Sequence, residues 1–165
     1  MFSIFNTSNQ NFLNFILSHT PNAVSYIKGN KFYPNINGKI ELYQTNAGVL
    51  VVSEIDNLKI DSNKSGFYAM HIHNGEDCEE NQNGEFKDTQ HYNPNNNSHP
   101  NHAGDLPNLL SNDGYVFNVV LTDRFQVKDV IGKTIMIHQN PDDGRTDPSG
   151  NSGTKIACGK IVTRF

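Results

Sequence analysis

The chain has 165 residues, enough for one domain with its own core, and its net charge of −4 without a Lys/Arg run argues against a general nucleic-acid binder. No stretch approaches the roughly 18 consecutive apolar residues of a transmembrane helix, so no membrane span is expected. Hydrophobic residues make up only 35%, and 13 Gly, seven Pro and many Asn favour short strands and turns over long helices.

Residues 1–22 are predicted to be an N-terminal extension to a domain at residues 23–165. Four apolar side chains could share one face of a short helix that docks a partner, namely Phe12, Leu13, Ile16 and Leu17. A loosely ordered extension is the plainer interpretation. The segment lacks a basic n-region and a small-residue cleavage site, so no secretory signal peptide is expected. This slightly favours a cytoplasmic location and leaves the localisation open.

Seven short segments have the apolar pattern of β-strands: 23–28, 36–43, 48–58, 67–73, 115–121, 134–138 and 155–162. Residues 74–112 and 139–153 are rich in Asn, Gly, Asp and Pro and follow no period, so they are expected to form two long loops. A loop as long as the first is unusual in a compact domain unless a metal ion and a disulfide replace the missing core. Short strands separated by turns predict an all-β antiparallel sandwich or barrel.

Six of the seven histidines fall between positions 71 and 138. His71 and His73 lie two apart on an expected strand, so their side chains project from the same face, although an exposed polar face would also suit such a pair. His138 ends an apolar run, where a solitary histidine is usually a hydrogen-bonded core residue. His91 precedes Tyr-Asn-Pro and could be an ordinary turn residue.

The cluster formed by His99, His102 and Asp105 is more specific. Its members are spaced three apart, and Gly104 gives the loop freedom to fold back. Two imidazoles and a carboxylate suit tetrahedral zinc and need one more nitrogen, which His91 could supply.

The remaining histidines, His71, His73 and His138, offer an all-nitrogen ligand set that suits copper in tetragonal geometry. A histidine that touched both ions would have to use both ring nitrogens, as an imidazolate. The pattern therefore predicts a binuclear metal site.

The two cysteines, Cys78 and Cys158, lie far apart in the chain. They cannot form a CxxC redox motif, and two thiols alone cannot make a structural zinc site. Composition leaves two alternatives open, a long-range disulfide and a pair of reduced, buried thiols.

Five segments resemble the signatures of the copper/zinc superoxide dismutase family: MHIHNGEDC, HYNP, HPNHAGDLPN, IHQNPDD and DPSGNSGTKIACG. They occur in the family's order, and the resemblance covers roughly residues 23–163. The resemblance implies a Greek-key antiparallel β-sandwich or flattened barrel of about eight strands with two long functional loops. It also implies copper and zinc as cofactors and superoxide as the substrate.

The resemblance assigns roles residue by residue. The implied copper ligands are His71, His73, His91 and His138, and the implied zinc ligands are His91, His99, His102 and Asp105. Asp142 matches the carboxylate that hydrogen-bonds ligands of both metals, and Cys78 and Cys158 match the family's intrasubunit disulfide. His91 is implied to bridge the metals and to carry a proton, while copper alternates between Cu(II) and Cu(I).

Lys155 departs from the family pattern, because the motif that usually reads Gly-x-Arg-x-Ala-Cys-Gly has lysine here. An ammonium still attracts an anion but lacks the planar fork of a guanidinium, so reduced activity and weaker anion discrimination are expected. The alternative is that Lys155 is a solvent-exposed loop residue without a role in anion binding. Arg145 could compensate from the second loop, and Ser149 corresponds to the family's threonine beside the copper channel.

Three functions follow from the sequence. The first is dismutation of superoxide, with Lys155 and His91 as catalytic residues. The second is a copper- and zinc-binding protein on the same scaffold, with weak or no dismutase activity because of Lys155. The third is a structural β-sandwich whose histidines are remnants, and the complete ligand set argues against it. A homodimer is an option that the sequence leaves open.

Overall fold

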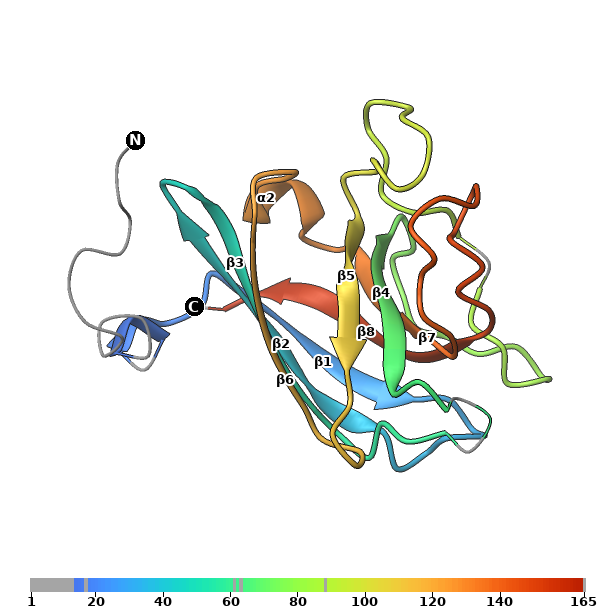
Figure 1. Cartoon of the computed structure of the whole chain (residues 1–165). Helices are drawn as coiled ribbons and strands as arrows, with labels where there is room; N and C mark the ends of the chain where they lie inside the picture. The colour runs from blue at the N-terminus through green and yellow to red at the C-terminus, as the bar shows by residue number, and fades with distance from the viewer. Residues whose placement is uncertain (1–13, 17, 61, 63, 88, 165) are drawn as a thin grey trace.

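The protein is described by a computed structural model that covers residues 14–16, 18–60, 62, 64–87 and 89–164. Eight antiparallel strands form one sheet that curls into a nearly closed barrel (Figure 1). The strands are β1 (Ala23–Gly29), β2 (Asn37–Thr45), β3 (Gly48–Asp56), β4 (Phe67–His73), β5 (Asp105–Leu110), β6 (Val116–Thr122), β7 (Thr134–His138) and β8 (Lys155–Thr163). A one-turn helix, α2 (Val127–Val130), joins β6 to β7.

The strand order is β5-β4-β7-β8-β1-β2-β3-β6, so several neighbours in the sheet are distant in sequence. β4 pairs with β7, and β8 pairs with β1. The two edge strands, β5 and β6, approach each other without a hydrogen-bonded ladder and form the seam of the barrel. The predicted all-β Greek-key architecture of about eight strands is confirmed.

Alternating side chains fill the barrel, as the sequence pattern predicts. In β2 and β3, Ile40, Leu42, Val51 and Ile55 point inward and are buried in the main apolar cluster, whereas Glu54 is partly exposed. Burial of one such side chain stabilises the fold by about 1.5–3 kcal/mol. Apolar packing therefore makes the barrel a stable frame for the loops that connect its strands.

One strand lies inside the segment expected to be a continuous loop. β5 has the sequence DLPNLL, in which Pro107 obscures the alternation because proline cannot donate to a ladder. β5 is an edge strand that pairs only with β4, and an edge tolerates proline. The first long loop therefore ends at residue 104, and Asp105 begins a strand.

Part of the N-terminal segment lies against the outside of the barrel. Residues 14–16 and 18 are helical, and Phe15 and Ile16 pack on Tyr43, Leu50 and Val52. The other members of the expected apolar face, Phe12, Leu13 and Leu17, lie outside the described residues. The division between extension and domain at residue 22 stays a prediction. Within the described chain, no helix has the length and apolar character needed to cross a membrane.

Two long loops gather at one side of the barrel, residues 74–104 after β4 and residues 139–154 after β7 (Figure 1). The predicted disulfide is present between Cys78 and Cys158, whose Cα atoms are 5.7 Å apart. It joins the first loop to β8 and packs beside Phe86 and Met136. The bridge therefore holds the first loop close to the strand that carries Lys155.

Candidate metal centre

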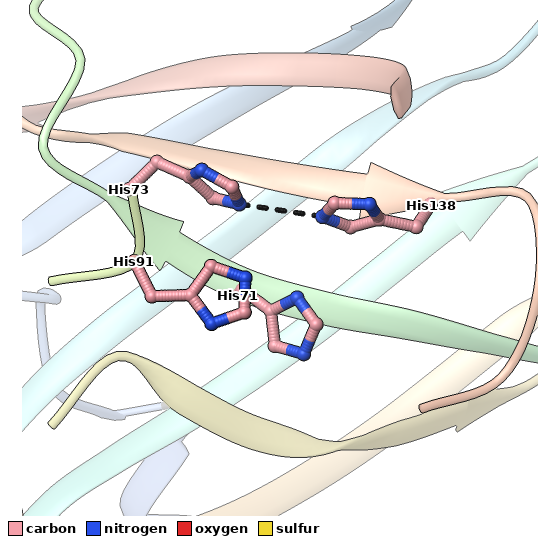
Figure 2. Close-up of side chains that lie close together, drawn as sticks. All are labelled: His71, His73, His91 and His138. Atoms are coloured by element: carbon pink, nitrogen blue, oxygen red, sulfur yellow. Dashed lines mark hydrogen bonds between the residues drawn. The ribbon is translucent and has the colours of Figure 1, made fainter. Parts of the chain in front are cut away.

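Neighbouring strands β4 and β7 position three of the histidines. His71 and His73 share one face of β4, while Ile72 between them points into the barrel core. His138 ends β7, whose residue Met136 is opposite His71 in the ladder. Figure 2 shows the rings of His71, His73 and His138 gathered on the outer side of these strands with His91.

The first loop brings His91 to this place through main-chain hydrogen bonds with the end of β4. His91 forms an isolated bridge with His73, and the Tyr92 amide donates to the Ile72 carbonyl at 2.7 Å. On the far side of His73, the Asn74 amide donates to the Gln90 carbonyl at 2.9 Å. His91 is therefore fixed beside β4, although it is distant from β4 in sequence.

Gly104 brings the segment that carries His99, His102 and Asp105 against the same strand. The Ile72 amide donates to the Gly104 carbonyl at 2.9 Å, and the Gly104 amide donates to the Tyr92 carbonyl at 2.8 Å. A Cβ at position 104 would lie 2.4 Å from the Ile72 carbonyl oxygen, so this approach requires glycine.

The histidines and Asp105 form two groups in which the candidate ligand atoms lie within 4.8 Å of one another. The first group is His71, His73, His91 and His138, and the second is His91, His99, His102 and Asp105. All members are buried. His91 belongs to both groups, and its Nδ1 lies 2.7 Å from Asp105 Oδ1 and 3.3 Å from His102 Nδ1.

Main-chain carbonyls set the tautomers of two rings in the first group. His73 Nδ1 donates to the Thr89 carbonyl at 2.6 Å, and His138 Nδ1 donates to the Gly153 carbonyl at 3.2 Å. Each ring then has its lone pair on Nε2, and the two Nε2 atoms face each other at 3.3 Å (Figure 2). Two lone pairs directed into the same space suit a cation.

Asp142 sets the other two tautomers and connects the groups. Its Oδ2 accepts from His71 Nε2 at 2.7 Å, and its Oδ1 accepts from His99 Nε2 at 2.9 Å. The Nδ1 atom of each ring is thereby left as an acceptor. Burial alone would raise the pKa of Asp142, but hydrogen bonds from His71, the Gly144 amide and His99 outweigh it and hold the pKa far below its usual range.

Within the part of the chain that the structure describes, three buried ring nitrogens have no hydrogen-bond partner: His71 Nδ1, His91 Nε2 and His99 Nδ1. A buried polar atom without a partner costs free energy, so these nitrogens indicate a ligand that they would contact. The first group offers nitrogen alone, which suits copper, and the second offers three nitrogens and a carboxylate, which suits zinc. The residues present therefore fit both cofactors.

Burial keeps the rings of His71, His73 and His138 neutral, which is the form that binds a metal. Desolvation, reinforced by the nearby His71, lowers the pKa of His138 to about 3. Desolvation also lowers the pKa of His71 and, more strongly, that of His73.

A cleft of about 670 Å³ opens onto the first group. Its lining includes His73, His91, His138, Ser149 and Lys155. Lys155 is opposite His138 in the β7–β8 ladder, and its Nζ donates to the Lys87 carbonyl at 3.3 Å. Arg145, which could have compensated for the missing arginine, is exposed, and the described residues that line the cleft do not include it.

The carbonyls of Thr89 and Gly153 orient two rings, yet nothing in the sequence marks them. Every residue has a main-chain carbonyl, so its use as an acceptor leaves no signal in residue type. Asp147 is also new to the site, because its Oδ1 accepts from the His99 amide at 2.7 Å and joins the two loops.

Comparison with known proteins agrees with this geometry. The sequence profile of the family described as copper/zinc superoxide dismutase matches residues 36–161. The chain is 36% identical over 140 residues to superoxide dismutase [Cu-Zn] 1 of Aquifex aeolicus, which covers 75% of this chain and 79% of that protein. It is 34% identical over 132 residues to superoxide dismutase [Cu-Zn] of Legionella pneumophila, which covers 75% and 76%.

A plant protein is similar as well. The chain is 30% identical over 155 residues to superoxide dismutase [Cu-Zn] 3 of Arabidopsis thaliana, which covers 84% of this chain and 88% of that protein. Barrel, disulfide and paired histidine groups agree with these matches, and the chain belongs to the copper/zinc superoxide dismutase family of oxidoreductases.

Proposed function

We propose that the protein dismutates superoxide, converting two superoxide anions and two protons into dioxygen and hydrogen peroxide. The observation that carries the proposal is the position of His91 between the two groups. Its Nε2 is a buried nitrogen without a hydrogen-bond partner, and its Nδ1 faces Asp105 and His102. One ring could therefore serve both metals.

In this proposal, His71, His73, His91 and His138 hold copper, and His91, His99, His102 and Asp105 hold zinc. Copper supplies one-electron chemistry, since it can accept an electron from one superoxide and pass it to a second, whereas zinc polarises and orients without redox chemistry of its own.

The chain itself supplies the proton and the orientation of the rings. His91 can hold a proton at Nε2 beside the cleft and pass it to an oxygen of the reduced substrate. Asp142 keeps the rings of His71 and His99 in the tautomers that leave Nδ1 unprotonated. The rings do not have to reorient during turnover, because each is held by a carbonyl or carboxylate.

Lys155 attracts the anion in this proposal. Its ammonium lies in the lining of the cleft, where burial of the histidines leaves them neutral, so it provides positive charge beside the first group. An ammonium attracts superoxide from solution but does not dock it through two parallel hydrogen bonds.

The second candidate function is copper and zinc binding with weak dismutase activity. Lysine in place of the family's arginine favours it, because the planar fork that would fix the anion is missing. The two candidates differ in the rate they predict for the fully metallated protein.

Reconstitution with copper and zinc, followed by direct measurement of superoxide decay, tests the proposal. We expect decay well above that caused by the same concentration of free copper, with both metals bound at one per chain. A fully metallated protein no faster than free copper would eliminate the enzyme and leave the metal-binding candidate.

Substitutions of Lys155 test its role in attraction. We expect Lys155→Met to lower the rate about tenfold or more at low ionic strength and to flatten its salt dependence, since steering by charge accelerates encounter by at least that factor. Lys155→Arg should raise the rate. The matched control is Lys160→Met, which removes an exposed lysine from the same strand. Equal rates and salt dependence in all four proteins would show that Lys155 does not guide the anion.

A further inference from the structure

Arg124 lies between β6 and α2, outside both metal groups, yet its guanidinium contacts the segment that carries three of the candidate ligands. Its Nη1 donates to the Pro100 carbonyl at 2.8 Å, the His102 carbonyl at 3.2 Å and the Asp105 carbonyl at 3.3 Å. Two of these carbonyls belong to candidate zinc ligands, and the third follows His99. One nitrogen therefore binds three main-chain carbonyls between residues 100 and 105.

The main chain in this segment determines where the ligand atoms lie. Asp105 Oδ2 accepts from the His102 amide at 3.0 Å, and Asp105 Oδ1 lies 2.7 Å from His91 Nδ1. A shift of the Asp105 backbone would therefore move the carboxylate away from both histidines. Arg124 contacts the same stretch of main chain through the carbonyls of His102 and Asp105.

Other contacts anchor the two ends of the segment, and within it Asn97 Nδ2 donates to the Asn101 carbonyl at 3.0 Å. Gly104 is tied to β4 through the Ile72 amide at 2.9 Å, and the His99 amide is tied to Asp147 of the second loop at 2.7 Å. Pro100 and His102 lie between these anchors. Arg124 connects this stretch to the barrel through the end of β6.

We propose that Arg124 is a positioning residue for the zinc group, which holds the turn 100–105 so that His102 and Asp105 converge with His91 and His99. The inference rests on the proposed zinc role of these four residues. Arginine suits the task because its planar guanidinium carries several donors and donates to carbonyls as a charged group. Its effect reaches the metal only through the main chain.

The direction in which zinc affinity changes when Arg124 is removed distinguishes a positioning role from a purely electrostatic one. A cation near a metal site repels the metal, so a purely electrostatic Arg124 would weaken zinc binding, and its removal would strengthen it. A positioning Arg124 predicts the opposite. Arg124→Lys sharpens the comparison, because it retains the charge while it loses the planar group that reaches three carbonyls.

The experiment measures zinc affinity and zinc release in copper-free protein by competition with a chromophoric chelator. We expect Arg124→Met to weaken zinc binding by about 10–100-fold, the usual effect of removing a group that orients metal ligands, and Arg124→Lys to restore part of the loss. Cobalt(II) bound at the same site should lose part of the intense visible absorption typical of tetrahedral coordination. The matched control is Lys128→Met, which removes an exposed cation from α2 and should leave zinc affinity and the cobalt spectrum unchanged.

Unchanged or tighter zinc binding in both Arg124 variants would overturn the inference while leaving the proposed function intact. Failure of the unsubstituted protein to bind zinc or cobalt would overturn the proposed function, and this inference with it. If Arg124→Met does not fold, as judged by far-ultraviolet circular dichroism, the Lys variant decides. Weaker zinc binding in Arg124→Lys supports positioning because the charge is kept, and unaltered binding refutes it.

Discussion

Asp142 is the residue that connects the two groups of candidate ligands. Its two oxygens accept from His71 and His99, one in each group. Gly150 passes so close that a Cβ there would lie 2.0 Å from Asp142 Oδ1, so the second loop packs directly on the carboxylate. A single side chain thus couples the orientation of candidate ligands in the two groups.

We predict that Asp142→Asn weakens the binding of copper and of zinc together. An amide has only one accepting oxygen, so it cannot accept from both rings, and loss of such a partner usually costs about 10–100-fold in metal affinity. Competition titrations with each metal measure the effect.

Asp143→Asn is the control for this substitution, because Asp143 caps its own loop through Thr146 and Asn151 and does not contact the histidines. A loss confined to one metal in Asp142→Asn would contradict a shared role.

At the scale of elements, the barrel and the first loop are stabilised by different means. Apolar side chains pack inside the strands, whereas the loop from residue 74 to 104 depends on the disulfide, on main-chain bonds to β4 and on polar side chains. Asn93, for example, donates to the Asn97 carbonyl at 2.8 Å and accepts from the Asn97 amide at 3.0 Å. Such a loop contributes little apolar burial of its own.

We predict that joint replacement of Cys78 and Cys158 by serine lowers the free energy of unfolding by about 4–5 kcal/mol. The physical reason is the larger conformational entropy of the unfolded chain once a closed loop of this length is opened. Urea unfolding of the metal-free protein measures the change. Reducing agent should destabilise the original protein and leave the double variant unaffected. Equal stability of the two oxidised proteins would contradict the prediction.

At the scale of the whole molecule, the buried histidines make the metal-free fold sensitive to acid. The pKa of His138 is lowered to about 3 by burial, whereas its ordinary value is 6.5. At a pH between these two values, His138 is protonated in the unfolded chain but neutral in the folded protein. Acidification therefore favours unfolding, and the stability is fully present only above about pH 6.5. His71 and His73 shift in the same direction.

We predict that the metal-free protein loses stability as the pH falls from 6.5 towards 3, by about 1.4 kcal/mol per pH unit for each histidine that stays neutral. Urea midpoints measured across this range give the slope. His138→Gln should make the slope shallower, because glutamine does not titrate. A slope that this substitution leaves unaltered would contradict the assignment to His138.

Local sequence was sufficient for much of the fold. Short apolar segments bounded by turn-forming residues predicted β4 and β7 with the ends that they have, Phe67–His73 and Thr134–His138, because such segments are typical of buried strands. The apolar pattern did not predict β5, because Pro107 interrupts it in this edge strand. The short helix α2 was also missed, since one turn is too short to show a period of 3.6.

The candidate ligands could be identified from residue type, spacing and family resemblance, because few side chains bind metals. Their ligand roles stay predictions. The resemblance already implied that His91 belongs to both groups. The tertiary structure alone decided that the carbonyls of Thr89 and Gly153 orient two of the rings and that Arg124 binds the main chain of residues 100–105. These features depend on hydrogen bonds between segments far apart in the chain, made largely by main-chain carbonyls that every residue has.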